Sequence, residues 1–396
     1  MAHPGTLLLI MAVAVLAPLL AHAAGRWIRV PLVIFEIALG IAVGPDVLGW
    51  AHTDTVIDTL SRLGLAMLIF LAGYEIDFTA VGGTVLRRAA GAWLAALALG
   101  LGAAATLAPR DAAVVIGTAL TSTALGTVLP ILRDSGDLRG RFGTVMLAFG
   151  AVGEFGPIIA MALLLSGRAP AQAAVLLVAF AVVTALAVVW AARPRPPWFS
   201  RVVAETLHSS AQFAVRWVML LLVSMLALAA AFGLDTLLGA FAAGVLTRLV
   251  LAGAAPGDSA EILGKVEAMG FGFLVPVFFV VTGIEFDLRA LLDGGRELLL
   301  LPLFLLLFLV VRGGPVYLLA PRDLGRADRG ALTLYCATCL PLVVAITTIG
   351  RGEGVIGSGE AAALVGAAML SVLIFPLSAL RLRAGRSTAG AEDEAW

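Results

Sequence analysis

The sequence has few charged residues and almost no cysteine. Asp, Glu, Lys and Arg make up 13% of its 396 residues, against about a quarter in an average soluble domain. Cys336 and Cys339 are the only cysteines, so a disulfide framework is excluded. The 26 basic and 26 acidic residues cancel, without the basic bias that is typical of proteins that bind nucleic acid. These features exclude a soluble globular domain and argue against a nucleic-acid partner.

Hydrophobic residues are in excess: they make up 61% of the chain and give a mean hydropathy of +1.05. A helix needs about 20 apolar residues to cross the hydrocarbon core of a bilayer. No basic residues precede the first apolar run, so we expect it to stay as a membrane span and not to be cleaved. Thirteen spans in the lipid bilayer are predicted, at about 6–24, 31–48, 60–77, 88–108, 111–132, 142–166, 171–191, 211–231, 234–250, 268–286, 297–318, 330–350 and 358–380.

The spans are predicted to form one transmembrane domain, 1–386, followed by a short cytoplasmic tail, 387–396. Residues 193–197 read Arg-Pro-Arg-Pro-Pro and contain the strongest helix breakers, so we expect a junction between two halves there. The expected parts are a first repeat over about 6–166, a linker helix over about 171–191 and a second repeat over about 211–380.

The distribution of basic residues predicts the orientation in the membrane. Eighteen of the 26 basic residues fall in loops on the side of the C-terminus and six on the other side, and the remaining two lie within spans. Because basic loops stay in the cytoplasm, we expect the N-terminus outside and the C-terminus inside. We therefore expect a multi-pass protein of the inner (plasma) membrane.

Two pairs of segments resemble each other. Residues 73–77 and 283–287 both read G-x-E-x-D after an apolar run that contains Phe, and residues 36–40 match residues 240–244 more weakly. Each pair is seven predicted spans apart, so its two members must cross the membrane in opposite directions. Inverted repeats are typical of secondary transporters, which bind their substrate near the membrane midplane. Chance similarity of helix ends is the alternative.

Glu154 is the clearest candidate for a functional residue. It lies in the middle of the 142–166 span, and a carboxylate is costly inside a membrane. Pro157 removes a helical hydrogen bond and leaves a carbonyl free, which suits cation coordination. The alternative is a structural glutamate paired with an arginine. Glu36, near the start of its span, is expected either to line an access path or to be a solvated or capping residue.

The 111–132 span carries Thr121, Ser122 and Thr123 at its centre. Hydroxyl residues and glycine at mid-membrane predict an unwound segment, whose carbonyls and hydroxyls can replace the water around a cation. The 330–350 span looks like its counterpart, because it carries Thr338 and Pro341. The alternative is that Ser and Thr only bond back to carbonyls of their own helix.

Arg312 lies inside the apolar 297–318 span and cannot lose its charge. We expect it to balance the charge of Glu154 or the C-terminal dipoles of broken helices, with snorkelling to the cytoplasmic surface as the alternative. The two cysteines fall within a helix, which argues against a redox or metal role. We therefore expect no cofactor and no resident metal, and the absence of a nucleophile and base pair argues against an enzyme.

Together these features resemble the monovalent cation:proton antiporter superfamily, and within it the bacterial sodium/hydrogen exchanger branch. The resemblance is carried by residues 31–36 with Gly44 and Pro45, 70–75, 121–123, 153–154 and 276–283. It implies an all-α polytopic membrane protein with about thirteen spans and two inverted repeats that contain crossed discontinuous helices. It also implies a homodimer with an elevator-like moving core.

The resemblance places an ion site on the 142–166 span, where the family has an acidic pair or an Asn-Asp pair. Here Gly153 stands at the first position and Glu154 at the second. Electrogenic members usually carry Lys where Arg312 stands, and Thr123 matches the threonine of the family's unwound helix. The resemblance therefore supports membership, and the two departures favour one titrating carboxylate.

These observations predict an antiporter that exchanges Na⁺ or K⁺ for protons by competition at Glu154, with an electroneutral cycle. Thr121, Ser122 and Thr123 would complete the cation's shell and Arg312 would balance the charge. Two alternatives stay open. One is a sodium-coupled symporter of an organic anion, for which Arg312 would supply a donor, and the other is a non-transporting membrane sensor or scaffold.

Overall fold

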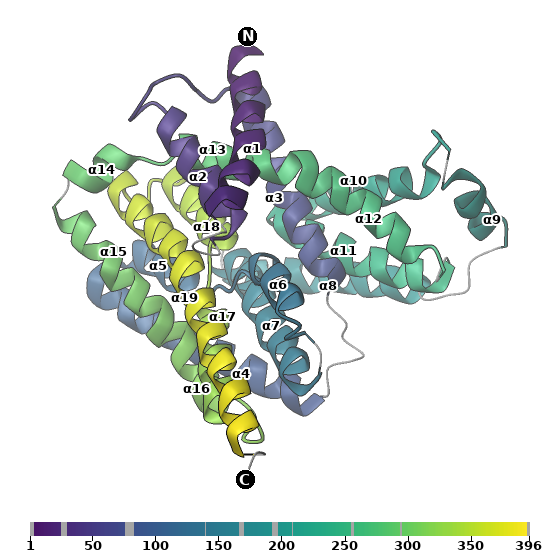
Figure 1. The fold of residues 1–396 in the computed structure, drawn as a ribbon. Coiled ribbons are helices and arrows are strands. Elements are labelled where there is room, and N and C mark those ends of the chain that lie inside the picture. Colours follow the sequence, from purple (N-terminus) through teal and green to yellow (C-terminus); the bar gives the residue numbers. More distant parts are fainter. Residues whose placement is uncertain are drawn as a thin grey trace. The chain divides into compact units, whose positions relative to one another are not determined.

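The computed structural model describes residues 4–24, 30–75, 83–138, 140–165, 170–191, 197–207, 209–254, 257–293 and 295–393. These residues form helices and no strands (Figure 1), so the all-α class is confirmed. Within them, eleven helices are long and apolar enough to cross a membrane. Residues 76 and 77 of the first G-x-E-x-D segment, and residues 193–196 of the predicted junction, lie outside the described ranges.

The eleven long helices correspond to eleven of the thirteen predicted spans. The other two are α2 (Leu32–Val43), which has only 12 residues, and the 111–132 span, which is divided into α5 (Arg110–Ala119) and α6 (Leu125–Asp134). The number thirteen therefore stays a prediction. The structure also contains two short helices that hydropathy did not indicate, α9 (Pro197–Thr206) and α14 (Leu288–Asp293).

The chain divides into two compact units, and each draws on both predicted repeats. The described residues of the smaller unit lie within 54–75 and 161–281, and those of the larger unit lie within 4–53, 83–160 and 282–393. Besides α9, the smaller unit contains α3 (Thr55–Glu75), α8 (Pro170–Ala191), α10 (Phe213–Ala231), α11 (Thr236–Ala254), α12 (Ser259–Met269), a π-helical turn (Gly270–Leu274) and most of α13 (Val275–Ile284). Besides α2, α5, α6 and α14, the larger unit contains α1 (Pro4–Ala24), α4 (Gly83–Leu107), α7 (Gly140–Leu164, whose end belongs to the smaller unit), α15 (Arg296–Leu307), a π-helical turn (Phe308–Gly313), α16 (Gly314–Leu319), α17 (Arg326–Ala337), α18 (Pro341–Gly352) and α19 (Ser358–Asp393).

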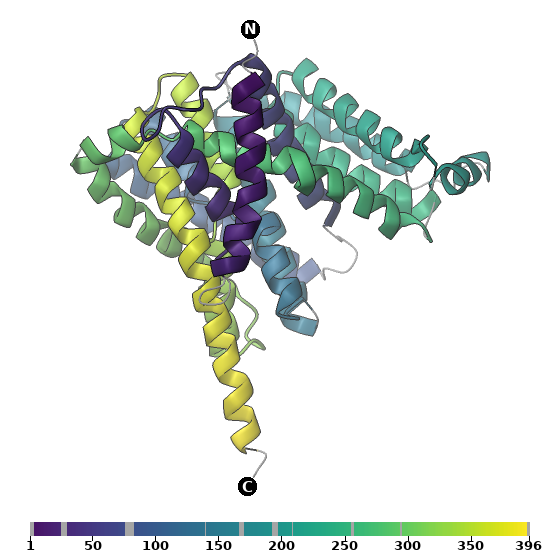
Figure 2. The same ribbon diagram turned by 45° about the horizontal axis from the view of Figure 1, so that its top comes forward.

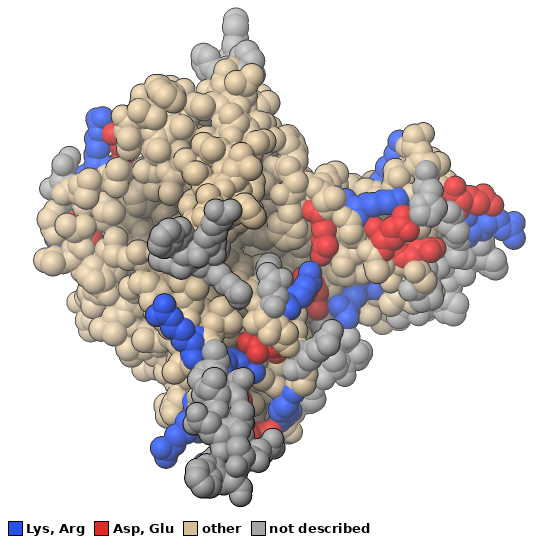
Figure 3. Space-filling view, viewed as in Figure 1, with Lys and Arg blue, Asp and Glu red and all other residues tan. Residues whose placement is uncertain are grey.

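The outer faces of several helices carry apolar side chains that are exposed. Val175 and Leu186 on α8 are 67% and 65% exposed, and Leu220 on α10 is 64% exposed. Figure 3 shows broad areas of the visible face without Lys, Arg, Asp or Glu. Because every backbone polar group inside a helix is bonded within that helix, such faces are compatible with the hydrocarbon of a membrane.

Glycines bring α3 and α11 of the smaller unit into backbone contact, and the two helices lie side by side in Figure 1. A Cβ atom at Gly73 would overlap the carbonyl oxygen of Phe241, and one at Gly244 would overlap the carbonyl oxygen of Phe70. Small residues at helix interfaces allow such close packing in membranes.

An equivalent contact joins α2 and the end of α13 in the larger unit. A Cβ atom at Gly283 would overlap the carbonyl oxygen of Ile37. When residues 36–40 are aligned with 240–244, Ile37 corresponds to Phe241, and Gly283 corresponds to Gly73 in the G-x-E-x-D alignment. The two contacts match in this alignment, and the repeat and its inverted orientation stay predictions.

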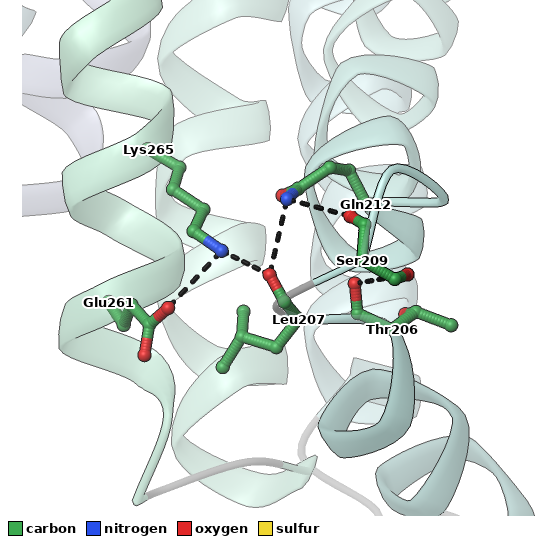
Figure 4. A network of polar contacts seen from close by, with 6 residues as sticks. All are labelled: Thr206, Leu207, Ser209, Gln212, Glu261 and Lys265. Atoms are coloured by element: carbon green, nitrogen blue, oxygen red, sulfur yellow. Dashed lines mark hydrogen bonds and ion pairs between the residues drawn. The ribbon is translucent and has the colours of Figure 1, made fainter.

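The only lysine of the chain fixes the connection between α9 and α10 (Figure 4). The ammonium of Lys265 donates to the carbonyl of Leu207 and pairs with Glu261 at 3.2 Å. The side-chain amide of Gln212, which has a φ of +44°, donates to the carbonyls of Leu207 at 3.2 Å and Ser209 at 3.0 Å. These bonds satisfy carbonyls that the end of α9 leaves without helical donors.

Candidate functional site

Two helix pairs in the larger unit are broken at the places where the sequence predicts unwound segments. Residues 120–124 separate α5 from α6, and residues 338–340 separate α17 from α18. The two breaks are bonded to each other, because the N–H of Ala124 donates to the carbonyl of Thr338 at 2.7 Å. The crossed discontinuous helices are therefore confirmed, and their ends direct four helix dipoles toward the crossing.

Thr123 makes the most connections at this crossing. Its hydroxyl donates to the carbonyl of Cys336 at 2.6 Å and accepts from Nε of Arg312 at 2.9 Å. Its backbone N–H donates to the carbonyl of Gly153 at 2.9 Å. The α5–α6 break is thus bonded to the α17–α18 break, to Arg312 and to α7.

Pro157 explains why the carbonyl of Gly153 is available. A proline has no N–H, so the carbonyl four residues before it lacks its helical donor. The N–H of Thr123 takes that place, and α7 continues through Pro157. The carbonyl that the sequence predicted to be free therefore anchors the unwound segment beside Glu154. Glu154 is 2% exposed in the middle of α7.

Arg312 is fully buried and lies in the π-helical turn between α15 and α16, a feature often found at functional sites. Besides the bond to Thr123, its Nη2 donates to the carbonyl of Phe149 at 2.8 Å. Nη1 forms no hydrogen bond within the described part of the chain. The snorkelling alternative is excluded, because the guanidinium points into the protein interior.

Gly153 provides the space that this arginine occupies. A Cβ atom at residue 153 would overlap Nη2 of Arg312 and Oγ1 of Thr123. The place where the family resemblance expects the first acidic or amide residue is therefore filled by a guanidinium. Sequence reasoning identified Gly153 as a missing acid, and the structure gives the glycine a packing role.

Thr121 and Ser122 are buried beside Thr123, and their hydroxyls bond back to α5. The acceptors are the carbonyls of Thr118 and Ala119, both at 2.8 Å. This is the bonding back to the same helix that the sequence offered as the alternative. Among the described residues, no hydrogen bond reaches the backbone carbonyls of Thr121, Ser122 and Thr123. Three backbone oxygens in one unwound segment can thus serve a cation.

The other two predicted residues are placed as follows. Pro341 is the first residue of α18, where a helix does not use the N–H that proline lacks. Glu36 is buried in α2 and, within the described residues, forms no hydrogen bond or ion pair with Thr123 or Arg312. The structure does not join Glu36 to the crossing.

A polar cavity of about 680 Å³ opens at the ends of α2, α13 and α18 in the larger unit. Its lining includes Asp46, His52, Asp287 and Arg351. A smaller cavity of about 40 Å³ shares part of this lining and extends along α18 to Val344, one helical turn from the start of α18. Neither lining includes Glu154, Arg312 or the segments 120–124 and 338–340, so these two cavities end short of the crossing.

Sequence reasoning missed the backbone acceptors of the site. The carbonyls of Phe149 and Cys336 bind Arg312 and Thr123, but a carbonyl is present in every residue and gives no signal in a sequence. Ser371 was also missed, although a hydroxyl residue within the apolar run of α19 is visible in the sequence.

Two curated proteins of similar sequence are named as antiporters. The Putative Na(+)/H(+) antiporter YjbQ of Bacillus subtilis is 28% identical over 95% of this chain, and the chain spans 63% of that protein's length. The Na(+)/H(+) antiporter of Enterococcus hirae is 23% identical over 90% of this chain and 92% of its own length.

A solved structure shows the same fold. It is that of the sodium proton antiporter MjNhaP1 from Methanocaldococcus jannaschii, with a TM-score of 0.66, 96% coverage of both chains and 16% identity. A family model described as sodium/hydrogen exchanger, transmembrane, matches residues 11–381. Because that match covers most of the sequence, the chain belongs to the family of transmembrane sodium/hydrogen exchangers.

Proposed function

We propose that this protein exchanges a monovalent cation, Na⁺ or K⁺, for protons across the plasma membrane, and that both ions compete for Glu154. The observation that carries the proposal is the position of this buried carboxylate, directly after Gly153, whose carbonyl holds the unwound segment 120–124. Relatives named as Na⁺/H⁺ antiporters support the choice of ions.

Competition follows from the cost of burying a charge. A bare carboxylate in a low-dielectric interior is unfavourable, whereas a protonated or cation-paired carboxylate is neutral. One carboxylate can hold a proton or a cation but not both. Moving Glu154 across the membrane is then favourable when it carries a proton or a cation, and unfavourable when it carries neither. This difference couples the proton flux in one direction to the cation flux in the other.

The cation's shell would come from the unwound segment. The backbone carbonyls of Thr121, Ser122 and Thr123 are available, and the hydroxyls of Thr121 and Ser122 keep lone pairs after donating their protons. Oxygen ligands of this kind replace water around alkali cations. Thr123 contributes mainly by position, since its hydroxyl already bonds Cys336 and Arg312.

Arg312 would balance the charge of the crossing without titrating. A guanidinium stays protonated in proteins, and its place next to Gly153 leaves no room for a second acid. One titrating carboxylate implies one proton per monovalent cation and an electroneutral cycle. Exchange in proteoliposomes should therefore be insensitive to an imposed membrane potential, and a strong voltage dependence would refute this stoichiometry.

The geometry favours antiport over the symport alternative. An organic anion would need Arg312 as a donor, but this residue is fully buried and its Nε and Nη2 are bonded to Thr123 and Phe149, which leaves only Nη1. A non-transporting sensor or scaffold would need no carboxylate at this depth. A homodimer, with the N-terminus outside and the C-terminus in the cytoplasm, is proposed from the family resemblance and the loop charges.

The proposal is tested by pH-gradient dissipation in proteoliposomes that contain the purified protein. Addition of Na⁺ or K⁺ should collapse an acid-interior gradient, whereas choline and anions of the bile-acid type should not. Exchange should be lost in Glu154→Gln and retained in Glu205→Gln, which changes an exposed glutamate on α9. Wild-type rates from Glu154→Gln would remove Glu154 from this role.

A further inference from the structure

A polar cluster outside the proposed ion site holds the α17–α18 break to α19. It centres on Ser371, which is fully buried in α19, the long yellow helix in Figure 2. The hydroxyl oxygen of Ser371 accepts the N–H of Cys339 at 3.1 Å. The hydroxyl proton is within reach of two carbonyls, those of Cys339 at 3.0 Å and Ala368 at 2.7 Å.

These contacts matter because Cys339 lies in the unwound segment and has no helical partners. A buried N–H or C=O without a partner costs free energy, and here both groups belong to one residue. The hydroxyl of Ser371 accepts the N–H, and it can donate its single proton either to the carbonyl of Cys339 or to that of Ala368. Ser371 therefore determines how the peptide groups on either side of Cys339 are oriented.

The orientation of Cys339 is transmitted to the other break. The preceding carbonyl, that of Thr338, accepts the N–H of Ala124 at 2.7 Å. The thiol of Cys339 also contacts the side chains of Ser371, at 3.8 Å, and Ser122. A continuous set of contacts thus runs from α19 through residues 338–340 to the segment 120–124, whose carbonyls are available to a cation.

We propose that Ser371 is a positioning residue for ion exchange, which sets cation affinity and selectivity by holding the 338–340 segment against the 120–124 segment. This inference rests on the proposed function. Ser371 need not touch the cation. Without its hydroxyl, the backbone of the crossing has several arrangements of similar energy, and cation binding has to select one of them.

The experiment compares Ser371→Ala with Ser371→Thr, which keeps a hydroxyl, and with Ser378→Ala. Ser378 lies on the same helix, is partly exposed, and bonds to the carbonyl of Ile374 in its own helix, at 2.8 Å. Each protein is reconstituted, and cation-dependent pH-gradient dissipation is measured over a range of Na⁺, Li⁺ and K⁺ concentrations. Thermal unfolding in detergent reports whether each variant is folded.

Ser371→Ala should raise the KM for the preferred cation about tenfold, the effect expected for one lost buried hydrogen bond. It should also reduce the ratio of KM values between cations, with a smaller change in the maximal rate. Ser371→Thr should recover most of the affinity, and Ser378→Ala should match the wild type. If Ser371→Thr fails to fold, the comparison with Ser378→Ala still decides.

The inference is wrong if folded Ser371→Ala keeps the wild-type KM and selectivity, or if only its maximal rate falls in step with its folded fraction. The proposed function fails in a different way, when the wild-type protein exchanges no cation for protons. The two failures are therefore distinguishable in one data set.

Discussion

Among single residues, Gly153 has the largest effect on where Arg312 lies. A Cβ atom there would meet Nη2 of Arg312 and Oγ1 of Thr123. We predict that Gly153→Ala displaces the guanidinium, lowers the free energy of unfolding by about 1–3 kcal/mol, as overpacking does, and abolishes exchange. Thermal unfolding in detergent and proteoliposome assays measure the two effects.

Gly102 provides the matched control for this substitution. It lies on α4, and a Cβ atom there would have no neighbouring atom within 4 Å. Gly102→Ala should therefore leave both stability and exchange close to the wild type or slightly increase stability. Equal behaviour of the two variants would show that the place of Arg312 does not depend on Gly153.

An exposed ion pair gives a pH prediction. Nε of Arg141 donates to Asp323 at 2.8 Å, and this hydrogen bond holds the pKa of Asp323 below its ordinary value of 3.8. A lowered pKa in the folded state stabilises the protein above that ordinary value, and the stabilisation is lost as the pH falls further. The small difference in melting temperature between wild type and Asp323→Asn should be constant from neutral pH to about pH 5 and should disappear below about pH 4.

Salt provides the control for this pair, because exposed charges are screened. The difference should shrink at high ionic strength. A difference that grows as the solution is acidified would contradict the assignment of the Arg141 hydrogen bond as the cause.

Residue identities indicated the candidate residues, but they did not indicate the hydrogen bonds between them. A carboxylate, an arginine and a Thr-Ser-Thr run inside apolar spans are visible in a sequence because each is costly in a membrane. The partners are not visible, since Thr123 bonds Cys336 and Arg312 across 213 and 189 residues of chain. The carbonyl of Gly153, four residues before Pro157, was predicted to be free but accepts the N–H of Thr123. A local sequence pattern does not show which remote donor bonds to such a carbonyl.

At the scale of helices, hydropathy located the spans and underestimated how they are broken. The breaks at 120–124 and 338–340 were indicated by hydroxyl residues, Gly and Pro. The π-helical turns at 270–274 and 308–313 were not predicted, although both contain glycine. Helix α9 was missed because it is short and amphipathic, and a search for long apolar runs does not detect such a helix.

The contact between α3 and α11 gives a prediction at this scale. A Cβ atom at Gly244 would overlap backbone atoms of α3, which cannot rotate away as a side chain can. Gly244→Ala should force the helices apart and lower the free energy of unfolding by at least about 1–3 kcal/mol. Gly253→Ala, on the same helix in open space, is the control, and equal melting temperatures for the two would contradict the close packing.

At the scale of the whole molecule, the loop charges predict the orientation in the membrane. Trp50, 64% exposed after α2, should lie outside, and Ser135, exposed after α6, should lie in the cytoplasm. A membrane-impermeant maleimide added to intact cells should label Trp50→Cys, and should label Ser135→Cys only after permeabilisation. Both native cysteines are buried, so they provide a low background. The reverse pattern would invert the proposed topology.

If a proton and a cation share Glu154, cation binding must release a proton, and this release can be measured. Purified protein in weakly buffered detergent solution is titrated with Na⁺ or K⁺ near the pH of half-maximal exchange, and the released protons are counted against bound cation. We expect up to one proton per bound cation for the wild type and none for Glu154→Gln. Cation binding without proton release in the wild type, or unchanged release in Glu154→Gln, would contradict the sharing of Glu154.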